Sequence, residues 1–184
     1  MFRPRLPVRT SRLTLRIAVP GDLDAVHSYR SLPEVCRYLP FEPMTREQVA
    51  DRVAGEWQRT ELREPPDALN LVVVENASGR LIGDTMLRLR SVEDQHAEIG
   101  YVFHPDGHGR GYGTEAAREL LRIGFTELGL HRMSADLDSR NGPSGRLLER
   151  LGMRREAHFC KETRFKGEWA DRLVYAMLAE EWDG

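Results

Sequence analysis

The sequence predicts an α/β (α+β) fold in which helices pack in layers on a mixed sheet. Strand-like and helical hydrophobic patterns are interspersed along the chain, with no internal repeat and no linker between them. Two pairs of successive strand-like runs are joined by short connections, one at residues 76–79 and one around residues 166–167, which indicates antiparallel pairing. With 184 residues the chain is long enough for a substantial core. We therefore expect residues 1–184 to form a single domain, with residues 1–10 as an N-terminal extension.

The first half of the chain predicts two helices and three strands. One helix is expected over residues 22–29. A second helix begins after a capping box at Thr45. It presents Val49, Val53 and Trp57 on one face, because these residues recur at four-residue steps. Strand-like runs occupy residues 13–17, 69–75 and 81–89.

The second half of the chain continues with a strand, a glycine-rich loop and a long amphipathic helix. Alternation in the strand, residues 95–103, places His96 and Glu98 on one face and apolar residues on the other. The helix after the loop is apolar along one side and stops at Gly129. Further strands are expected at residues 131–137, 153–163 and 171–177, and a short helix at residues 143–151.

The glycine-rich loop, residues 104–115, is the most informative part of the sequence. Gly109, Gly111 and Gly113 alternate between the strand and the helix, so the backbone can turn tightly there. The N-terminus of the following helix adds unpaired N–H groups and the positive end of its dipole. Arg110 lies within the same loop and can add a charge-assisted contact. These features together suit a phosphate or pyrophosphate group.

Two common phosphate-binding motifs do not fit this loop. A P-loop requires a lysine, and this region has none, which also disfavours a kinase. The dinucleotide fingerprint G-x-G-x-x-G would place its last glycine at Tyr112 or Thr114. What remains is a phosphate loop of another kind, or a glycine-rich turn that only begins a helix.

Four segments of the chain resemble known motifs. Residues 108–113, H-G-R-G-Y-G, resemble the acyl-CoA loop Q/R-x-x-G-x-G/A of the GNAT acetyltransferases, with His in place of the Gln or Arg. Residues 141–153 resemble the GNAT segment N-x-x-S/A-x-x-h-h-E-K-h-G-F, where h is apolar. Residues 97–101, A-E-I-G-Y, and residues 10–16, T-S-R-L-T-L-R, resemble the branch of ribosomal-protein N-terminal acetyltransferases of the RimJ/RimL type. The resemblance covers nearly the whole chain.

The resemblance implies the GNAT fold, a mixed and mostly antiparallel sheet splayed into a V with helices on both faces. It also implies an N-acyltransferase that passes an acyl group, in the first place acetyl, directly from acyl-CoA to a primary amine. The acceptor is then a protein N-terminus or a small molecule such as a polyamine, an amino acid or an aminoglycoside. A homodimer is the assembly that the family suggests. The residues implied to contact the cofactor are Val102, Phe103, His108, Gly109, Arg110, Gly111, Tyr112, Gly113, Thr114, Asn141 and Ser144.

Acetylation of an amine needs a group that removes a proton, because amines with a pKa of about 8 to 10.4 are mostly protonated at pH 7. Glu98 is the candidate base, since burial on a central strand would raise the pKa of its carboxyl group. His96 on the same face is the reserve base. The alternative for Glu98 is an ordinary strand residue in a surface ion pair.

The donor of a proton to the leaving thiolate follows only from the resemblance. Many GNAT enzymes carry a tyrosine where this chain has Leu148, and Ser144 on the same short helix is the candidate substitute. Ser144 is alternatively a small packing residue beside the pantetheine. Asn141 contacts the pantetheine arm, caps the helix that follows, or does both.

Composition and charge exclude several classes of protein. The net charge is −2 with both signs interspersed, so no basic surface indicates nucleic-acid binding. The sequence shows no signal-peptide pattern and no run long enough to span a membrane. Cys36 and Cys160 are expected as reduced thiols of a cytoplasmic protein, and neither they nor His104 and His108 have the spacing of a metal site. We therefore expect no metal, nucleic-acid or membrane partner.

A non-catalytic acyl-CoA-binding sensor or interaction domain with the same fold is the alternative to an enzyme. The absence of a tyrosine at Leu148 favours that alternative, whereas Glu98, Asn141 and the loop glycines favour the enzyme. Aromatic residues of the segment 38–57 are expected on the acceptor side. Acids such as Asp84 either attract a cationic acceptor or belong to the solvated surface. The sequence leaves the acceptor, the acyl group and the oligomeric state open.

Overall fold

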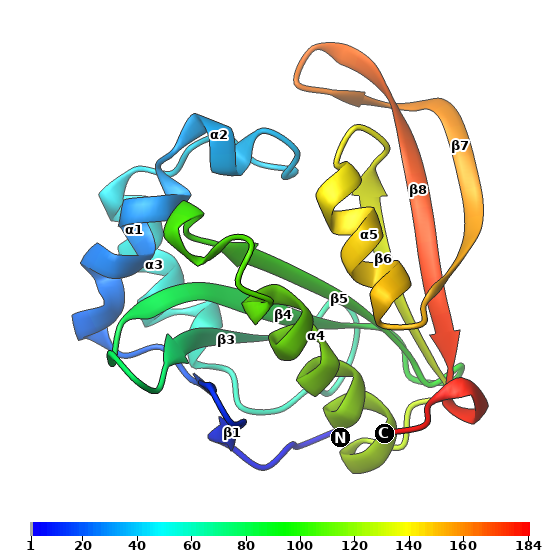
Figure 1. Ribbon diagram of the computed structural model, residues 1–184, viewed down its shortest axis with the longest axis horizontal. Coiled ribbons are helices and arrows are strands. Elements are labelled where there is room, and N and C mark those ends of the chain that lie inside the picture. The colour runs from blue at the N-terminus through cyan, green and yellow to red at the C-terminus, as the bar shows by residue number, and fades with distance from the viewer. Residues whose placement is uncertain (1) are drawn as a thin grey trace.

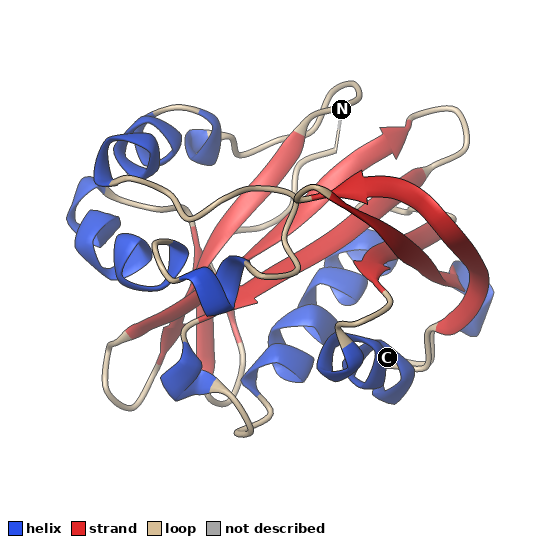
Figure 2. Ribbon diagram, turned by 90° about the horizontal axis from the view of Figure 1, so that it is seen from above, coloured by secondary structure: helices blue, strands red, loops and turns tan. Residues whose placement is uncertain are grey.

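The computed structural model describes residues 2–184, in which helices cover both faces of an eight-stranded sheet (Figures 1 and 2). The strands are β1 (Val8–Arg9), β2 (Leu13–Arg16), β3 (Ala68–Glu75), β4 (Leu81–Ser91), β5 (His96–Phe103), β6 (Arg132–Asp138), β7 (Arg154–Phe165) and β8 (Glu168–Leu178). The α-helices are α1 (Leu23–Arg30), α2 (Pro33–Cys36), α3 (Arg46–Ala54), α4 (Tyr112–Arg122) and α5 (Gly142–Arg150). Short 3-10 turns are η1 (Pro20–Asp22), η2 (Glu56–Gln58), η3 (Pro105–Gly107) and η5 (Ala179–Glu181), and η4 (Ile123–Glu127) is a π-helical turn that continues α4. Within residues 2–184, every helix is too short or too polar to cross a membrane.

The strands lie in the order β1-β2-β3-β4-β5-β6-β8-β7. Neighbouring strands are antiparallel except β5 and β6, which are parallel. The β5–β6 contact is brief, since it runs only from the pair His96–Arg132 to the pair Glu98–Ser134. Beyond these pairs the two strands diverge, with α5 over the opening (Figure 1). The mixed, mostly antiparallel sheet predicted from the sequence is confirmed.

Alternation along the strands builds a core on each face of the sheet. Leu71 and Val73 of β3 pack into the core that includes α4 and α5, whereas Val72 between them packs into the core that includes α1 and α3. β5 follows the same rule, because Ile99 belongs to the first core and Val102 to the second. The site described below lies at the end of β5, a strand that contributes residues to both cores.

The helix α3 shows how closely local signals determine the element. Thr45 Oγ1 accepts a hydrogen bond from the Gln48 amide at 3.2 Å, and Gln48 Oε1 accepts one from the Thr45 amide at 2.9 Å, which confirms the capping box. The helix ends at Ala54, since Gly55 has φ −108° and ψ −105°, outside the helical region. A Cβ at Gly55 would lie only 2.9 Å from the carbonyl oxygen of Asp51, which favours glycine there. The prediction that Trp57 belongs to this helix is therefore wrong, since Trp57 lies beyond α3 in η2, where it is fully buried.

The N-terminal residues are attached to the sheet. Phe2 and Leu62 exchange two backbone hydrogen bonds of 2.8 Å each. Val8 of β1 pairs with Leu15 of β2, and the two-residue strand β1 was not expected from the sequence. Residues 2–9 thus pack along the β2 side of the molecule and lead directly into the segment that contacts the glycine-rich loop.

A buried ion pair joins α1 to β4. Arg30 donates to both carboxylate oxygens of Asp84, at 2.6 and 2.9 Å, and the Tyr29 hydroxyl donates to the same carboxylate at 2.5 Å. The Arg30 guanidinium also lies over the rings of Phe41 and Trp57. The Asp84 side chain is only 2% exposed, so this acid is neither a solvated surface residue nor accessible to an acceptor.

The substitution Asp84→Asn should destabilise the protein by about 3–5 kcal/mol, because it leaves the Arg30 charge buried without its partner. Urea denaturation of the purified variant measures this loss. The exposed pair Arg46–Asp24 is the control, since Asp24→Asn should cost less than about 1 kcal/mol. Equal stability of the two variants would contradict a structural role for the buried pair.

Candidate active site

The glycine-rich loop connects η3 to the N-terminus of α4. Gly109 and Gly111 have φ angles of +72° and +80°, in the left-handed region that glycine adopts at little cost. Within residues 2–184, none of the six amide N–H groups from Gly109 to Thr114 donates a hydrogen bond. These amides stand at the positive end of the α4 dipole. The arrangement can bind an anion such as a phosphate through the backbone.

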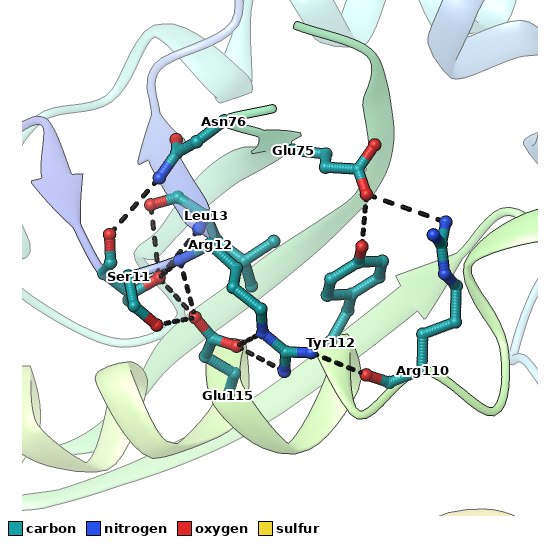
Figure 3. A network of polar contacts seen from close by, with 9 residues as sticks. Ser11, Arg12, Leu13, Glu75, Asn76, Arg110, Tyr112 and Glu115 are labelled. Atoms are coloured by element: carbon teal, nitrogen blue, oxygen red, sulfur yellow. Dashed lines mark hydrogen bonds and ion pairs between the residues drawn. The ribbon is translucent and has the colours of Figure 1, made fainter. Parts of the chain in front are cut away.

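The position of this loop depends on Glu115 in the first turn of α4 (Figure 3). Its carboxylate accepts hydrogen bonds from Thr10 Oγ1 at 2.5 Å, from Arg12 Nε at 2.6 Å and from the Arg12 amide at 3.2 Å. Burial opposes ionisation of Glu115, but the hydrogen bonds from Thr10 and Arg12 prevail and lower its pKa. Arg12 also donates to the carbonyl oxygen of Arg110 at 2.9 Å, so one side chain connects the loop with the helix.

A second set of contacts orders the side chains of the loop (Figure 3). The Tyr112 hydroxyl donates to Glu75 at the end of β3, and Arg110 Nη1 lies 3.6 Å from the same carboxylate. The Arg110 side chain is 57% exposed. His108 turns back, with Nε2 3.2 Å from the carbonyl oxygen of Phe103. In this structure the two basic side chains of the loop therefore contact protein groups, and the backbone amides supply the open donors.

Gly113 has a packing role. A Cβ at this position would lie 2.9 Å from Leu147 Cδ1 of α5 and within 4 Å of the Phe103 ring. Glycine therefore allows α4 to approach α5 and β5 closely. The sequence pointed to Gly113 as a residue that lets the loop turn, and the structure adds this packing reason for a glycine at the position.

The opening between β5 and β6 lies beside the loop. Val102 and Phe103, at the end of β5, continue past the last residue that pairs with β6. Asn141 stands at the start of α5, and its Oδ1 accepts a hydrogen bond from the Ser144 amide at 3.3 Å. The capping role foreseen for Asn141 is confirmed.

Glu98 occupies the last β5–β6 pair, at the base of the opening. Its side chain is 15% exposed, and Arg90 Nη1 lies 3.4 Å from Oε2. Burial raises the pKa of Glu98, the nearby Asp136 carboxylate adds to this effect, and the neighbouring arginines only partly offset it. The ion pair foreseen as an alternative is thus present, and Glu98 nevertheless remains a weaker acid than an ordinary glutamate.

His96 lies two residues before Glu98 on β5, so the two side chains share one face of the strand. Its Nε2 is 2.8 Å from Ser134 Oγ on β6. Burial and the positive charge of Arg132 lower the pKa of His96. The imidazole is therefore predominantly neutral at pH 7 and can accept a proton.

Sequence reasoning missed a hydroxyl pair that crosses from β5 to α5. Tyr101 Oη lies 2.8 Å from Ser144 Oγ, and burial raises the pKa of Tyr101 to about 12. Leu148, at the position where the resemblance would place a tyrosine, is fully buried. A tyrosine hydroxyl thus reaches Ser144 from the strand instead of the helix. The segment 97–101 contained this tyrosine, but its contact with Ser144 required knowledge of how α5 packs.

His104 and His108, which the sequence placed in the loop, make different contacts in the structure. His104 Nδ1 accepts a hydrogen bond from the Asp106 amide at 3.1 Å, while His108 contacts the end of β5. On the predicted acceptor side, Pro40, Phe41 and Glu42 line a hollow of about 320 Å³ together with the tip of the β7–β8 hairpin.

Comparison with known proteins agrees with this geometry. Residues 12–154 match the family described as acetyltransferase (GNAT) domain. The uncharacterized N-acetyltransferase YnaD of Bacillus subtilis is 34% identical over 176 residues, which cover 96% of this chain and 99% of that protein. A GNAT-family acetyltransferase from Bacillus anthracis has a crystal structure that superimposes with a TM-score of 0.85 at 34% identity, covering 96% of this chain and 100% of that chain. The spermidine N(1)-acetyltransferase of Vibrio cholerae is 26% identical, over 92% of this chain and 95% of that protein.

These relatives favour catalysis over a binding-only module. The glycine-rich loop and the divergent strands agree with the matched family. The chain therefore belongs to the GNAT family of acetyltransferases and is an acyltransferase.

Proposed function

We propose that this enzyme transfers the acetyl group of acetyl-CoA directly to a primary amine, as a RimJ/RimL-like N-acetyltransferase of the cytoplasm formed by one domain, residues 1–184. The observation that carries the proposal is the row of free amides at residues 109–114 beside the β5–β6 opening. The motifs at residues 10–16 and 97–101 support the branch, and in the structure both belong to the site: one positions the loop, and the other supplies Glu98 and Tyr101.

The pyrophosphate of CoA is the anion that suits the loop. The amides of residues 109–114 and the α4 dipole favour two adjacent negative groups, and Tyr112 and Thr114 take part through this backbone. The amide of His108 donates to the carbonyl oxygen of Pro105, so His108 would contact the cofactor only through its side chain. The exposed Arg110 side chain can exchange Glu75 for a phosphate. Val102, Phe103 and Asn141 flank the opening, where the pantetheine arm would extend.

Proton removal from the amine is assigned to Glu98. The carboxylate takes a proton from the ammonium group, directly or through a water molecule. The neutral nitrogen then forms a bond to the thioester carbonyl carbon, releases its second proton to water, and the carbon–sulfur bond breaks. A raised pKa suits Glu98 to this task, because a stronger base takes up the proton of the ammonium group more readily. The neutral imidazole of His96 is the reserve base on the same face.

Protonation of the leaving thiolate is assigned to Ser144 together with Tyr101. The hydroxyl of Ser144 gives a proton to the sulfur and can regain one from Tyr101 through their 2.8 Å contact. Tyr101 is protonated at neutral pH, since its pKa is about 12. The pair thus provides a donor in a chain that has Leu148 instead of a helical tyrosine.

The acceptor is proposed to be a protein N-terminus or a small amine such as a polyamine. The relative from Vibrio cholerae is named for its action on spermidine, which supports the small-amine class. The hollow at Pro40, Phe41 and Glu42 offers apolar surface, and a cationic chain would compete with Lys166, whose Nζ lies 3.5 Å from the Glu42 carboxylate.

Release of free thiol from acetyl-CoA, measured with a panel of polyamines, amino acids, aminoglycosides and N-terminal peptides, tests this function. We expect release that depends on one class of amine and a product acetylated on nitrogen, as identified by mass spectrometry. Tight binding of acetyl-CoA without turnover on any amine would reject the proposal.

Gly111→Val should raise both the KM and the Kd for acetyl-CoA by about 10-fold or more, a loss of roughly 1.4 kcal/mol. A β-branched residue disfavours the left-handed backbone of this position, so the amides would move. Calorimetry with CoA measures the change. Gly79→Val is the matched control, because Gly79 has φ +69° and no atom within 4 Å of a Cβ. Unchanged CoA binding by Gly111→Val would remove the basis of the phosphate site.

Glu98→Gln should lower kcat by about 100-fold, the usual contribution of a general base, with little change in the Kd for acetyl-CoA. In the unaltered enzyme kcat/KM should fall as the pH decreases through a pKa above the ordinary glutamate value of about 4.3, because protonated Glu98 cannot accept a proton. The variant should lose this acidic limb. Glu156→Gln is the control, because Glu156 of β7 forms an ion pair with Arg132 of β6. If kcat/KM of Glu98→Gln depended on pH as in the unaltered enzyme, Glu98 would not be the general base.

Ser144→Ala and Tyr101→Phe should each lower kcat by about 100-fold if the two hydroxyls form one proton donor. The double variant should then be no slower than either single variant, since groups that act as a unit are not additive. Steady-state rates of the three variants, each with its acetyl-CoA Kd, provide the comparison. Retention of most of kcat by Ser144→Ala would instead support a packing role.

A further inference from the structure

A bulge in the β7–β8 hairpin brings together three side chains that the proposed acyl transfer does not use. The strand register shifts between Phe159 and Thr163, and Lys161 within the bulge has a φ angle of +48°. Cys160 lies in this bulge on β7, and Asp171 lies opposite it on β8.

The donor atoms of His158, Cys160 and Asp171 lie close to one another. His158 Nε2 lies 2.8 Å from Asp171 Oδ2 and 3.9 Å from Cys160 Sγ, and the three donor atoms are all within 4.8 Å of one another. In a nucleophile–histidine–acid triad the nucleophile and the acid contact opposite nitrogens of the ring. Here both contact Nε2, so the cluster cannot relay a proton from Cys160 to Asp171. The same arrangement places three ligand atoms around one position for a cation.

The backbone of the bulge orients the carboxylate. Asp171 Oδ1 accepts a hydrogen bond from the Lys161 amide at 2.9 Å, which leaves Oδ2 directed toward His158. An outer contact of this kind fixes a ligand before a metal binds.

The chemistry of the three groups indicates which metal fits. One thiolate, one imidazole and one carboxylate form a mixed sulfur, nitrogen and oxygen set, which suits Zn²⁺. A thiolate and a carboxylate together neutralise a divalent ion. Lys161, within the bulge, carries a positive charge close to these ligands, and its side chain is exposed to solvent. Arg172 next to Asp171 pairs instead with Glu162 and Asp136.

We propose that His158, Cys160 and Asp171 bind one Zn²⁺ ion, with a fourth coordination position open to water. The exposed positions of His158 and Cys160 allow the ion to enter from solvent. Bound zinc would connect β7 to β8 at the bulge and stiffen the hairpin. Its tip contacts the acceptor side, since Lys166 Nζ donates to the carbonyl oxygen of Cys36 at 2.8 Å and lies 3.5 Å from Glu42.

Titration of the untagged, reduced full chain with Co²⁺ and then Zn²⁺ tests the proposal. Cobalt bound to a thiolate gives a sulfur-to-metal charge-transfer band, and we expect one Co²⁺ per chain, displaced by one Zn²⁺. Cys160→Ser should abolish the band. His158→Ala and Asp171→Asn should weaken Zn²⁺ binding by at least the roughly 10-fold that loss of an outer-shell partner costs. Asp171→Asn keeps an oxygen for the Lys161 amide, so the bulge is preserved.

Two control variants separate this site from other binding. Cys36→Ser removes the buried cysteine, and Glu162→Gln removes a carboxylate of the same hairpin that pairs with Arg172. Both should retain the cobalt band and the zinc affinity of the unaltered protein. A band that persists in Cys160→Ser, a band lost in Cys36→Ser, or the absence of any band would overturn the proposal. None of these readouts depends on acetyl transfer.

Discussion

The attachment of the α4 N-terminus to the sheet is the constraint on which the rest of the site depends. Glu115 receives hydrogen bonds from Thr10 and Arg12, and Arg12 also reaches the carbonyl oxygen of Arg110. The loop is thus held through a carbonyl and a side-chain carboxylate, and its amides at residues 109–114 remain available as donors. A loop held by its own amides would have no donors left for an anion. The contacts that determine its shape are therefore separate from those that would bind CoA.

The strand β5 organises the proposed chemistry. It pairs with β6 only as far as Glu98, and the backbone beyond that residue borders the opening. Because alternate residues of a strand face opposite ways, Glu98 and Tyr101 lie on opposite faces of the sheet. Tyr101 meets Ser144 on the α5 side, while Glu98 lies near Asp136 on the other side. One strand can in this way provide a base on the side where the amine would enter and a donor on the side of the leaving sulfur.

Much of the fold could be predicted because its signals are local. The capping box at Thr45, the alternation in β5 and the glycine-rich loop each depend on residues close together in the sequence, and each was found at or near its predicted position. The helix α3 was extended too far toward Trp57, because the apolar period continued past Gly55 although the backbone did not. The family motifs indicated the acyl-transfer chemistry before any geometry was known.

The parts that escaped prediction depend on packing between distant segments. Asp84 resembled a surface acid until α1 brought Arg30 against it. The contact between Tyr101 and Ser144 depends on the position of α5 over β5. His158 and Asp171 meet only because a bulge shifts the register of two strands. The periodicity and spacing of residues in a single sequence do not determine the register in which these two strands pair.

Both lateral margins of the sheet are unsuited to strand addition. β1 is only two residues long, and β7 is interrupted by two register shifts and bears many exposed charged residues. Irregular, charged outer strands offer a poor template for hydrogen bonding to another chain. A second copy of this protein would consequently associate through helices or side chains, and the eight-stranded sheet would end where each monomer ends.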